Sequence, residues 1–156
     1  MSRYYVTTAI DYVNGRPHLG HAYEKVAADA LARYHRLLGD DTRFLTGLDE
    51  HSQNVEKAAR REGLEPVAYT DRMAGHFRAA WAALDISHDD FIRTTEERHA
   101  VGVRELLARI QARGDIYPGH YEGWYCGGCE AFKPEKDLVE GRCPVHQTKP
   151  DWIRED

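Results

Sequence analysis

The order of apolar and polar residues predicts a strand and then a helix at the start of the chain. Arg3 to Thr8 is rich in aromatic and β-branched residues, and an irregular stretch from Ala9 to Pro17 is expected to follow. A helix is predicted from about His18 to Leu38, because apolar residues recur at spacings of three and four and Gly39 follows as a stop. The recurring positions are Tyr23, Val26, Ala27, Ala30, Leu31, Tyr34 and Leu38.

Strand and helix patterns keep alternating as far as Arg113. The predicted elements are a strand over Thr42–Thr46, a helix over Gln53–Glu62 capped by Ser52, a helix starting at Pro66, a strand over Phe91–Thr94 and a helix over Glu96–Arg113. The last two helices have apolar stripes, formed by Met73, Phe77, Trp81 and Leu84 and by Val103, Leu106, Leu107 and Ile110. Because parallel strands need crossover connections and helices supply them, the alternation favours an α/β fold with a parallel sheet.

A change in composition after Gly114 divides the chain into two expected modules. Tyr117 to Tyr125 is rich in glycine and aromatic residues, and all three cysteines lie between Cys126 and Cys143. We therefore expect one module over residues 1–115 and a second over residues 116–156.

Composition and charge narrow the class of protein. The 156 residues are 42% hydrophobic and 30% charged, and no apolar run approaches the roughly 20 residues of a membrane span. The start of the chain lacks the features of a secretory signal, so the cytoplasm is the expected compartment and no membrane partner is expected. The net charge of -5 disfavours a free-standing nucleic-acid binder, so any RNA contact would need a local patch.

A short motif, His18-Leu19-Gly20-His21, lies after the first strand and its loop, at the opening of the first helix. The first-turn amides of a helix are unpaired and electropositive, which suits a bound phosphate. Two imidazoles can donate hydrogen bonds to a polyphosphate, and Gly20 lets a flat ring approach the backbone. The motif therefore favours nucleotide binding, although a single histidine is more often a surface or packing residue.

A second group of residues contains two pairs, Cys126 with Cys129 and Cys143 with His146. Thirteen residues lie between the two pairs. Closely spaced pairs of thiolate and imidazole ligands are typical of a tetrahedral zinc site. Four protein ligands would leave no open coordination position, so the expected role of Zn²⁺ is structural. The alternative is three free or buried thiols in a reducing compartment.

Three runs of sequence resemble the signature regions of bacterial methionyl-tRNA synthetases, and the resemblance extends over essentially the whole chain. It implies a Rossmann-like parallel sheet, the first half of a class I synthetase catalytic domain, followed by a small zinc-knuckle insertion. The runs are Thr7–Tyr23, Ala28–Arg36 and Phe44–His51.

The resemblance implies that the complete enzyme activates methionine with ATP and Mg²⁺ to methionyl-adenylate and transfers the methionyl group to tRNA(Met). His18, Gly20 and His21 match the ATP-binding motif of the family, and the two histidines are the expected catalytic residues.

Four further residues match family positions that bind methionine. Ala9, Ile10 and Tyr12 match the lining of the amino-acid pocket, and Tyr12 offers an apolar ring with a polar tip. Asp49 matches the carboxylate that pairs with the α-amino group of the substrate. Its position after a strand agrees, because ligands of open α/β sheets bind at the carboxyl ends of strands.

The 156 residues contain no Lys-rich run of the kind that holds ATP phosphates in class I synthetases. The chain is therefore expected to be a fragment, a truncated reading frame or half of a split enzyme, and to be inactive alone. Two other readings stay open: a different class I synthetase or nucleotidyltransferase, and a non-catalytic, zinc-bearing interaction or RNA-binding module.

Overall fold

The computed structural model describes residues 2–155, which form two compact units. The first unit ends at Gly102 and the second begins at Val103, within helix α4 (Glu97–Ala112). The module boundary expected between residues 115 and 116, where the composition changes, stays a prediction. No helix among the described residues is long and apolar enough to span a bilayer.

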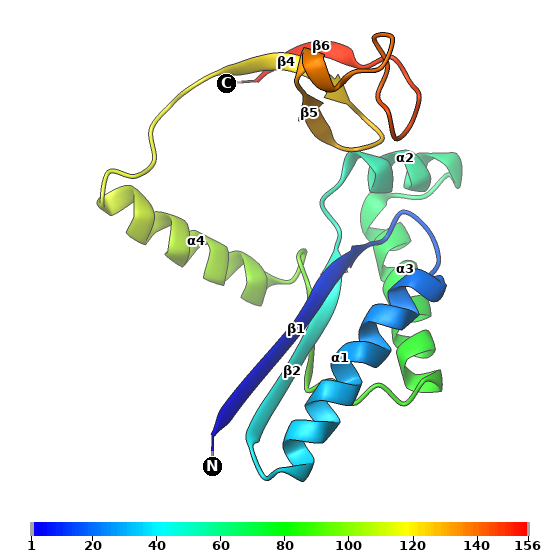
Figure 1. Ribbon diagram of the computed structural model, residues 1–156, viewed down its shortest axis with the longest axis vertical. Coiled ribbons are helices and arrows are strands. Elements are labelled where there is room, and N and C mark those ends of the chain that lie inside the picture. Colours follow the sequence, from blue (N-terminus) through cyan, green and yellow to red (C-terminus); the bar gives the residue numbers. More distant parts are fainter. Residues whose placement is uncertain (1, 156) are drawn as a thin grey trace. The chain divides into compact units, whose positions relative to one another are not determined.

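The first unit is built on a three-stranded parallel sheet in the order β1-β2-β3. Its strands are β1 (Arg3–Tyr12), β2 (Asp41–Asp49) and β3 (Asp90–Arg93). Helix α1 (Leu19–Leu37) connects β1 to β2, and α2 (Gln53–Arg61) and α3 (Pro66–Ala83) connect β2 to β3 (Figure 1). The predicted parallel α/β arrangement is confirmed.

The first two strands are longer than the sequence pattern predicts. β1 continues to Tyr12, so the expectation of irregular structure from Ala9 onwards is wrong for the first four of those residues. A β-bulge explains the error: β1 advances from Thr7 to Ile10 while β2 advances only from Leu45 to Gly47. The extra residue interrupts the two-residue alternation that identifies a strand.

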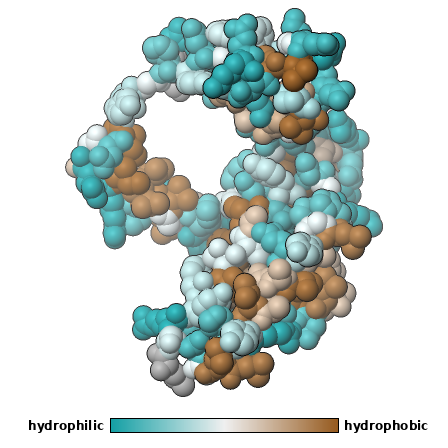
Figure 2. Space-filling model, in the orientation of Figure 1, coloured by the Kyte–Doolittle hydropathy of each residue, from teal (hydrophilic) through white to brown (hydrophobic). Residues whose placement is uncertain are grey.

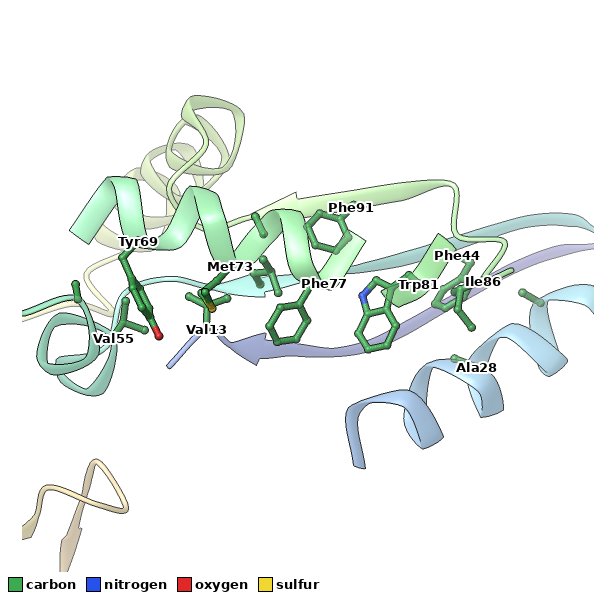
Figure 3. Close-up of a cluster of buried hydrophobic side chains, with 14 residues drawn as sticks. Val13, Ala28, Phe44, Val55, Tyr69, Met73, Phe77, Trp81, Ile86 and Phe91 are labelled. Atoms are coloured by element: carbon green, nitrogen blue, oxygen red, sulfur yellow. The ribbon is translucent and has the colours of Figure 1, made fainter. Parts of the chain in front are cut away.

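The core of the first unit lies where α1 and α3 pack on the sheet. Figure 3 shows Tyr69, Met73, Phe77 and Trp81 of α3 in one row, next to Phe44 of β2. The apolar stripe predicted for α3 is therefore buried, with one correction. Leu84 is 45% exposed because it is the C-cap residue and lies beyond the last helical turn.

Helix α4 forms as predicted, but most of its apolar side chains are exposed. Val103, Leu106 and Leu107 are 40%, 60% and 49% exposed, and α4 has no buried residue. Figure 2 shows the resulting apolar surface along this helix.

The second unit contains a three-stranded antiparallel sheet in the order β5-β4-β6. Its strands are β4 (Tyr121–Cys126), β5 (Ala131–Lys133) and β6 (Asp151–Glu155), with a short 3-10 turn, η1 (Glu135–Asp137), after β5. Trp124 and Trp152 pack edge to face across β4 and β6, with ring centroids 5.1 Å apart. Cys126 is the last residue of β4, and Cys129 lies three residues later in the turn between β4 and β5.

Candidate functional site

The carboxyl ends of β1 and β2 bring together residues predicted to bind an amino acid. Tyr12 is the register partner of Asp49, and Ile10 is the partner of Gly47. Tyr12 and Ile10 are 48% and 38% exposed, so both side chains are open to a ligand. Asp49 is half-buried, and its Oδ1 accepts a hydrogen bond of 3.2 Å from the backbone N–H of His51.

The two motif histidines cap the start of α1. Nδ1 of His18 accepts from the backbone N–H of Gly20 at 3.1 Å, and Nδ1 of His21 accepts from the backbone N–H of His18 at 3.2 Å. The two rings stack with centroids 3.7 Å apart. Because Nδ1 accepts in both rings, these bonds assign the neutral Nε2–H tautomer to each.

Both Nε2–H groups are therefore available as donors. The nearest carboxylate is Asp11, whose Oδ1 lies 4.0 Å from Nε2 of His21, beyond hydrogen-bonding distance. A pair of neutral N–H donors at a helix start suits the oxygens of a phosphate chain.

Burial lowers the pKa of His21, and the Asp11 carboxylate only partly opposes this effect. We expect the His21 ring to titrate below its ordinary pKa of about 6.5 and to be neutral at pH 7. Between the two pKa values the unfolded chain binds more protons than the folded chain. The stabilisation linked to His21 is therefore fully present above the unfolded-state pKa of about 6.5, and it is lost as pH falls through the folded-state pKa. An NMR titration of the His21 ring checks this. A midpoint at or above 6.5 would contradict it, and Asp11→Asn should lower the midpoint further.

A buried lysine, which the sequence reasoning missed, lies beneath this site. The Lys25 ammonium donates to Asp11 Oδ1 at 2.8 Å, to Glu24 Oε2 at 2.8 Å and to the Ala9 carbonyl at 3.1 Å. Lys25 is 0% exposed. Burial raises the pKa of Glu24, but hydrogen bonds from Lys25 and from the Ala9 N–H outweigh this and hold it below its usual range.

A second buried network fixes the segment after Asp49. The Glu50 backbone N–H donates to Thr94 Oγ1 at 2.9 Å, and its fully buried carboxylate accepts from Arg93 Nε at 2.7 Å. Arg93 also pairs with Asp71 of α3 at 2.6 Å. This network ties the ends of β2 and β3 together next to Asp49.

The four predicted metal ligands form one cluster in the second unit. Their ligand atoms all lie within 4.8 Å of one another. Nδ1 of His146 is 3.2 Å from Cys129 Sγ, 3.9 Å from Cys126 Sγ and 4.0 Å from Cys143 Sγ, and the Sγ atoms of Cys129 and Cys143 are 3.6 Å apart. A tetrahedral zinc ion with metal–sulfur bonds of about 2.3 Å needs ligand separations of roughly 3.5 to 3.8 Å. The observed separations lie on both sides of this range, so shifts of about 1 Å or less in the ligand atoms would give the shell of a tetrahedral ion.

The thiols of the cluster differ in acidity. A backbone hydrogen bond from His146 is the main reason that the pKa of the Cys143 thiol is lowered to about 6. Burial raises the pKa of Cys129, and its hydrogen bonds to the neighbouring thiols raise it further. A thiol with a lowered pKa supplies the thiolate that a metal requires.

Comparison with known proteins decides the family. The model of the family "tRNA synthetases class I (M)" matches residues 4–152. The chain belongs to the methionyl-type class I tRNA synthetases. A methionine–tRNA ligase of Fusobacterium nucleatum is 54% identical over 90% of this chain and 22% of its own length. A methionine–tRNA ligase of Thermotoga maritima is 44% identical over 99% of this chain and 25% of its own length.

Solved structures agree with this family. The methionyl-tRNA synthetase of Mycobacterium tuberculosis in complex with methionyl-adenylate has a TM-score of 0.91 and 45% identity, over 99% of this chain and 31% of that one. LeuRS from Agrobacterium radiobacter has a TM-score of 0.78 at 19% identity, over 98% of this chain and 20% of that one, which shows the shared class I fold alone. The chain thus spans about a quarter of the length of its methionyl-type relatives.

The structure of this synthetase domain arranges the predicted site residues in four places. His18, Gly20 and His21 meet at the start of α1, and Ile10, Tyr12 and Asp49 meet at the strand ends. Ala9 lies at the bulge, where its backbone is bound by α1. The four metal ligands form the separate cluster described above, in the second unit.

The sequence pattern did not indicate the buried lysine, because the apolar positions that predicted α1, such as Tyr23 and Val26, are 80% and 49% exposed. Lys25 lies three residues before Ala28 and seven before Ala32, both buried, so it falls on the packed face of α1. A lysine at such a position needs buried charged partners, and Asp11 and Glu24 provide them.

Proposed function

We propose that this chain carries the first half of the catalytic domain of a methionine–tRNA ligase, with residues that bind methionine and ATP. The observation that carries the proposal is the similarity, over 99% of the chain, to a synthetase solved with methionyl-adenylate. The complete enzyme would join methionine to the α-phosphate of ATP, release pyrophosphate, and pass the methionyl group to tRNA(Met).

Each site residue has a role that its geometry supports. The Nε2–H donors of His18 and His21 stabilise charge that develops on the phosphates of Mg²⁺-bound ATP, and Gly20 leaves room for the adenine ring. The Asp49 carboxylate pairs with the α-amino group of methionine.

The methionine side chain has its own contacts in this proposal. Tyr12 and Ile10 present apolar surface to the thioether on the same side of β1, and Ala9 borders them at the bulge. Polarisable sulfur packs favourably against an aromatic ring such as that of Tyr12.

The test is methionine-dependent exchange of pyrophosphate into ATP by a complete synthetase that contains this chain. We expect exchange with methionine and much less with leucine or valine. Exchange driven best by leucine or valine would assign the site to another class I synthetase, and no exchange with any amino acid would leave the non-catalytic reading.

We also propose that Cys126, Cys129, Cys143 and His146 bind one structural Zn²⁺. Three thiolates and an imidazole fill a tetrahedral shell, so the ion would link β4 to the segment before β6 and leave no position for a substrate. Transfer to tRNA belongs to the complete enzyme, and the cytoplasmic location stays a prediction.

Gly128 is expected to be necessary for the metal site. A Cβ at this residue would lie 2.7 Å from Cδ2 and 2.8 Å from Cγ of His146. Gly128→Ala should displace the imidazole and weaken zinc retention about tenfold or more. Competition with a chelator measures this. Gly119→Ala, where an added Cβ meets nothing within 4 Å, is the matched control. Equal zinc retention by the two variants would contradict the prediction.

A further inference from the structure

The β-bulge in β1 reverses which residues face the open side of the sheet. Before the bulge, Tyr5 is 61% exposed, while Val6 packs against the core. After it, Tyr12 is 48% exposed, whereas Asp11 and Val13 are 6% and 0% exposed. Odd-numbered residues thus point outwards before the bulge and inwards after it. Without the extra residue, the period of two would turn Tyr12 towards the core.

Two neighbouring side chains of α1 hold the backbone at this bulge. Glu24 Oε1 accepts from the Ala9 N–H at 2.7 Å, and Lys25 Nζ donates to the Ala9 carbonyl at 3.1 Å. Glu24 and Lys25 also pair with each other at 2.8 Å. Both polar groups of one bulge residue are therefore bound by a single helix.

The buried Lys25 also selects this register. Its ammonium pairs with Asp11, which faces the core only because the bulge is present. A shift by one residue would leave a buried ammonium without this carboxylate, and an unpaired buried charge is strongly destabilising. The ion pair and the bulge therefore support each other.

We propose that Glu24 and Lys25 are positioning residues of the methionine pocket. They hold the bulge so that Ile10 and Tyr12 face the open side of the sheet, next to Asp49. They lie one turn after His21 on α1, so one helix carries the phosphate-binding donors and also sets the shape of the amino-acid pocket. Because the proposal rests on the function proposed above, its test must separate the two.

The test compares Glu24→Ala with the unmodified sequence, in a complete synthetase that contains this chain. Loss of the acceptor for the Ala9 N–H should raise the KM for methionine about tenfold or more, because small misplacements at a reacting site are costly. The KM for ATP should change by less than about twofold, since the hydrogen bonds that hold His18 and His21 at the start of α1 do not involve Glu24. Glu24→Gln keeps an acceptor oxygen and should recover part of the loss. Glu56→Ala, which removes an exposed carboxylate paired with Arg60, is the matched control.

The outcomes distinguish the two proposals. No methionine-dependent exchange by the unmodified enzyme would contradict the proposed function. With an active unmodified enzyme, an unchanged KM for methionine in Glu24→Ala, or an equal rise in both KM values, would overturn the positioning role.

A second measurement applies to the 156-residue chain itself and does not depend on activity. Amide hydrogen exchange at Ala9 should be faster in Glu24→Gln than in the unmodified chain, because an amide oxygen accepts more weakly than a carboxylate. The Phe44 amide, which is bound by the Asp89 carboxylate at 2.6 Å, should exchange at an unchanged rate. Equal exchange at Ala9 in both chains would also overturn the proposal.

Discussion

Replacing Cys143 with serine is expected to release the metal and to loosen the chain after Tyr117. Cys126 and Cys143 are 1% and 0% exposed, whereas the aromatic residues Tyr121 and Trp152 of the same unit are 59% and 56% exposed. The cluster of predicted metal ligands thus occupies the place of an apolar core. Structural zinc supplies about 10 to 16 kcal/mol in small zinc-binding peptides, and a serine hydroxyl is a poor substitute for a thiolate.

Elemental analysis and the amide NMR spectrum measure the two parts of this prediction. We expect a zinc content near zero and loss of dispersed signals from residues 117–155, while signals from the first unit persist. His120→Ala provides a control, because this histidine of the same unit lies outside the ligand cluster. A Cys143→Ser chain that retains zinc at the unmodified level would refute the prediction.

The 156-residue chain alone is expected to give no measurable methionine-dependent exchange of pyrophosphate into ATP. In the proposed mechanism His18 and His21 supply donors for the phosphates, but the chain contains no Lys-rich run to neutralise the rest of the developing charge. Phosphoryl chemistry depends largely on such positioning and electrostatic stabilisation. Removing a single preorganised donor costs about 10²- to 10³-fold in an enzyme, so the loss of a whole loop should exceed about a thousandfold.

The exchange assay needs an untagged preparation and a complete synthetase containing the same residues as the positive control. A His21→Ala version of the complete enzyme tests the part of the charge stabilisation that this chain supplies, and its kcat should fall about a hundredfold. Robust exchange by the isolated chain would show that the transition state is stabilised without a Lys-rich loop.

The kind and order of the elements in the first unit could be predicted from the sequence, because apolar residues recur with the period of each element. The buried face of α1 could not be predicted in this way, since its periodic residues Tyr23 and Val26 are 80% and 49% exposed. The carboxyl end of β1 could not be predicted either. The bulge changes the phase of the alternation, and the contacts that stabilise it come from Glu24 and Lys25, at least fifteen residues away from Ala9. Local patterns do not record such contacts.

The same distinction applies to the candidate site. The predicted metal ligands and the histidine motif are short patterns with fixed spacing, and the structure brings each set of residues together. The Glu50 network joins residues more than forty positions apart, so no local pattern indicated it. In helix α4 the apolar periodicity predicted the helix correctly, but it did not predict that Leu106 is exposed.

A crystal structure of a complete synthetase containing this chain, with a non-hydrolysable methionyl-adenylate analogue bound, would show directly whether the predicted residues form the binding site. We expect the α-amino group within about 3 Å of the Asp49 carboxylate and the thioether against Tyr12. We also expect the adenylate at the start of α1, next to His18 and His21. An analogue bound elsewhere, with these side chains free of contact, would contradict the assignment of the site.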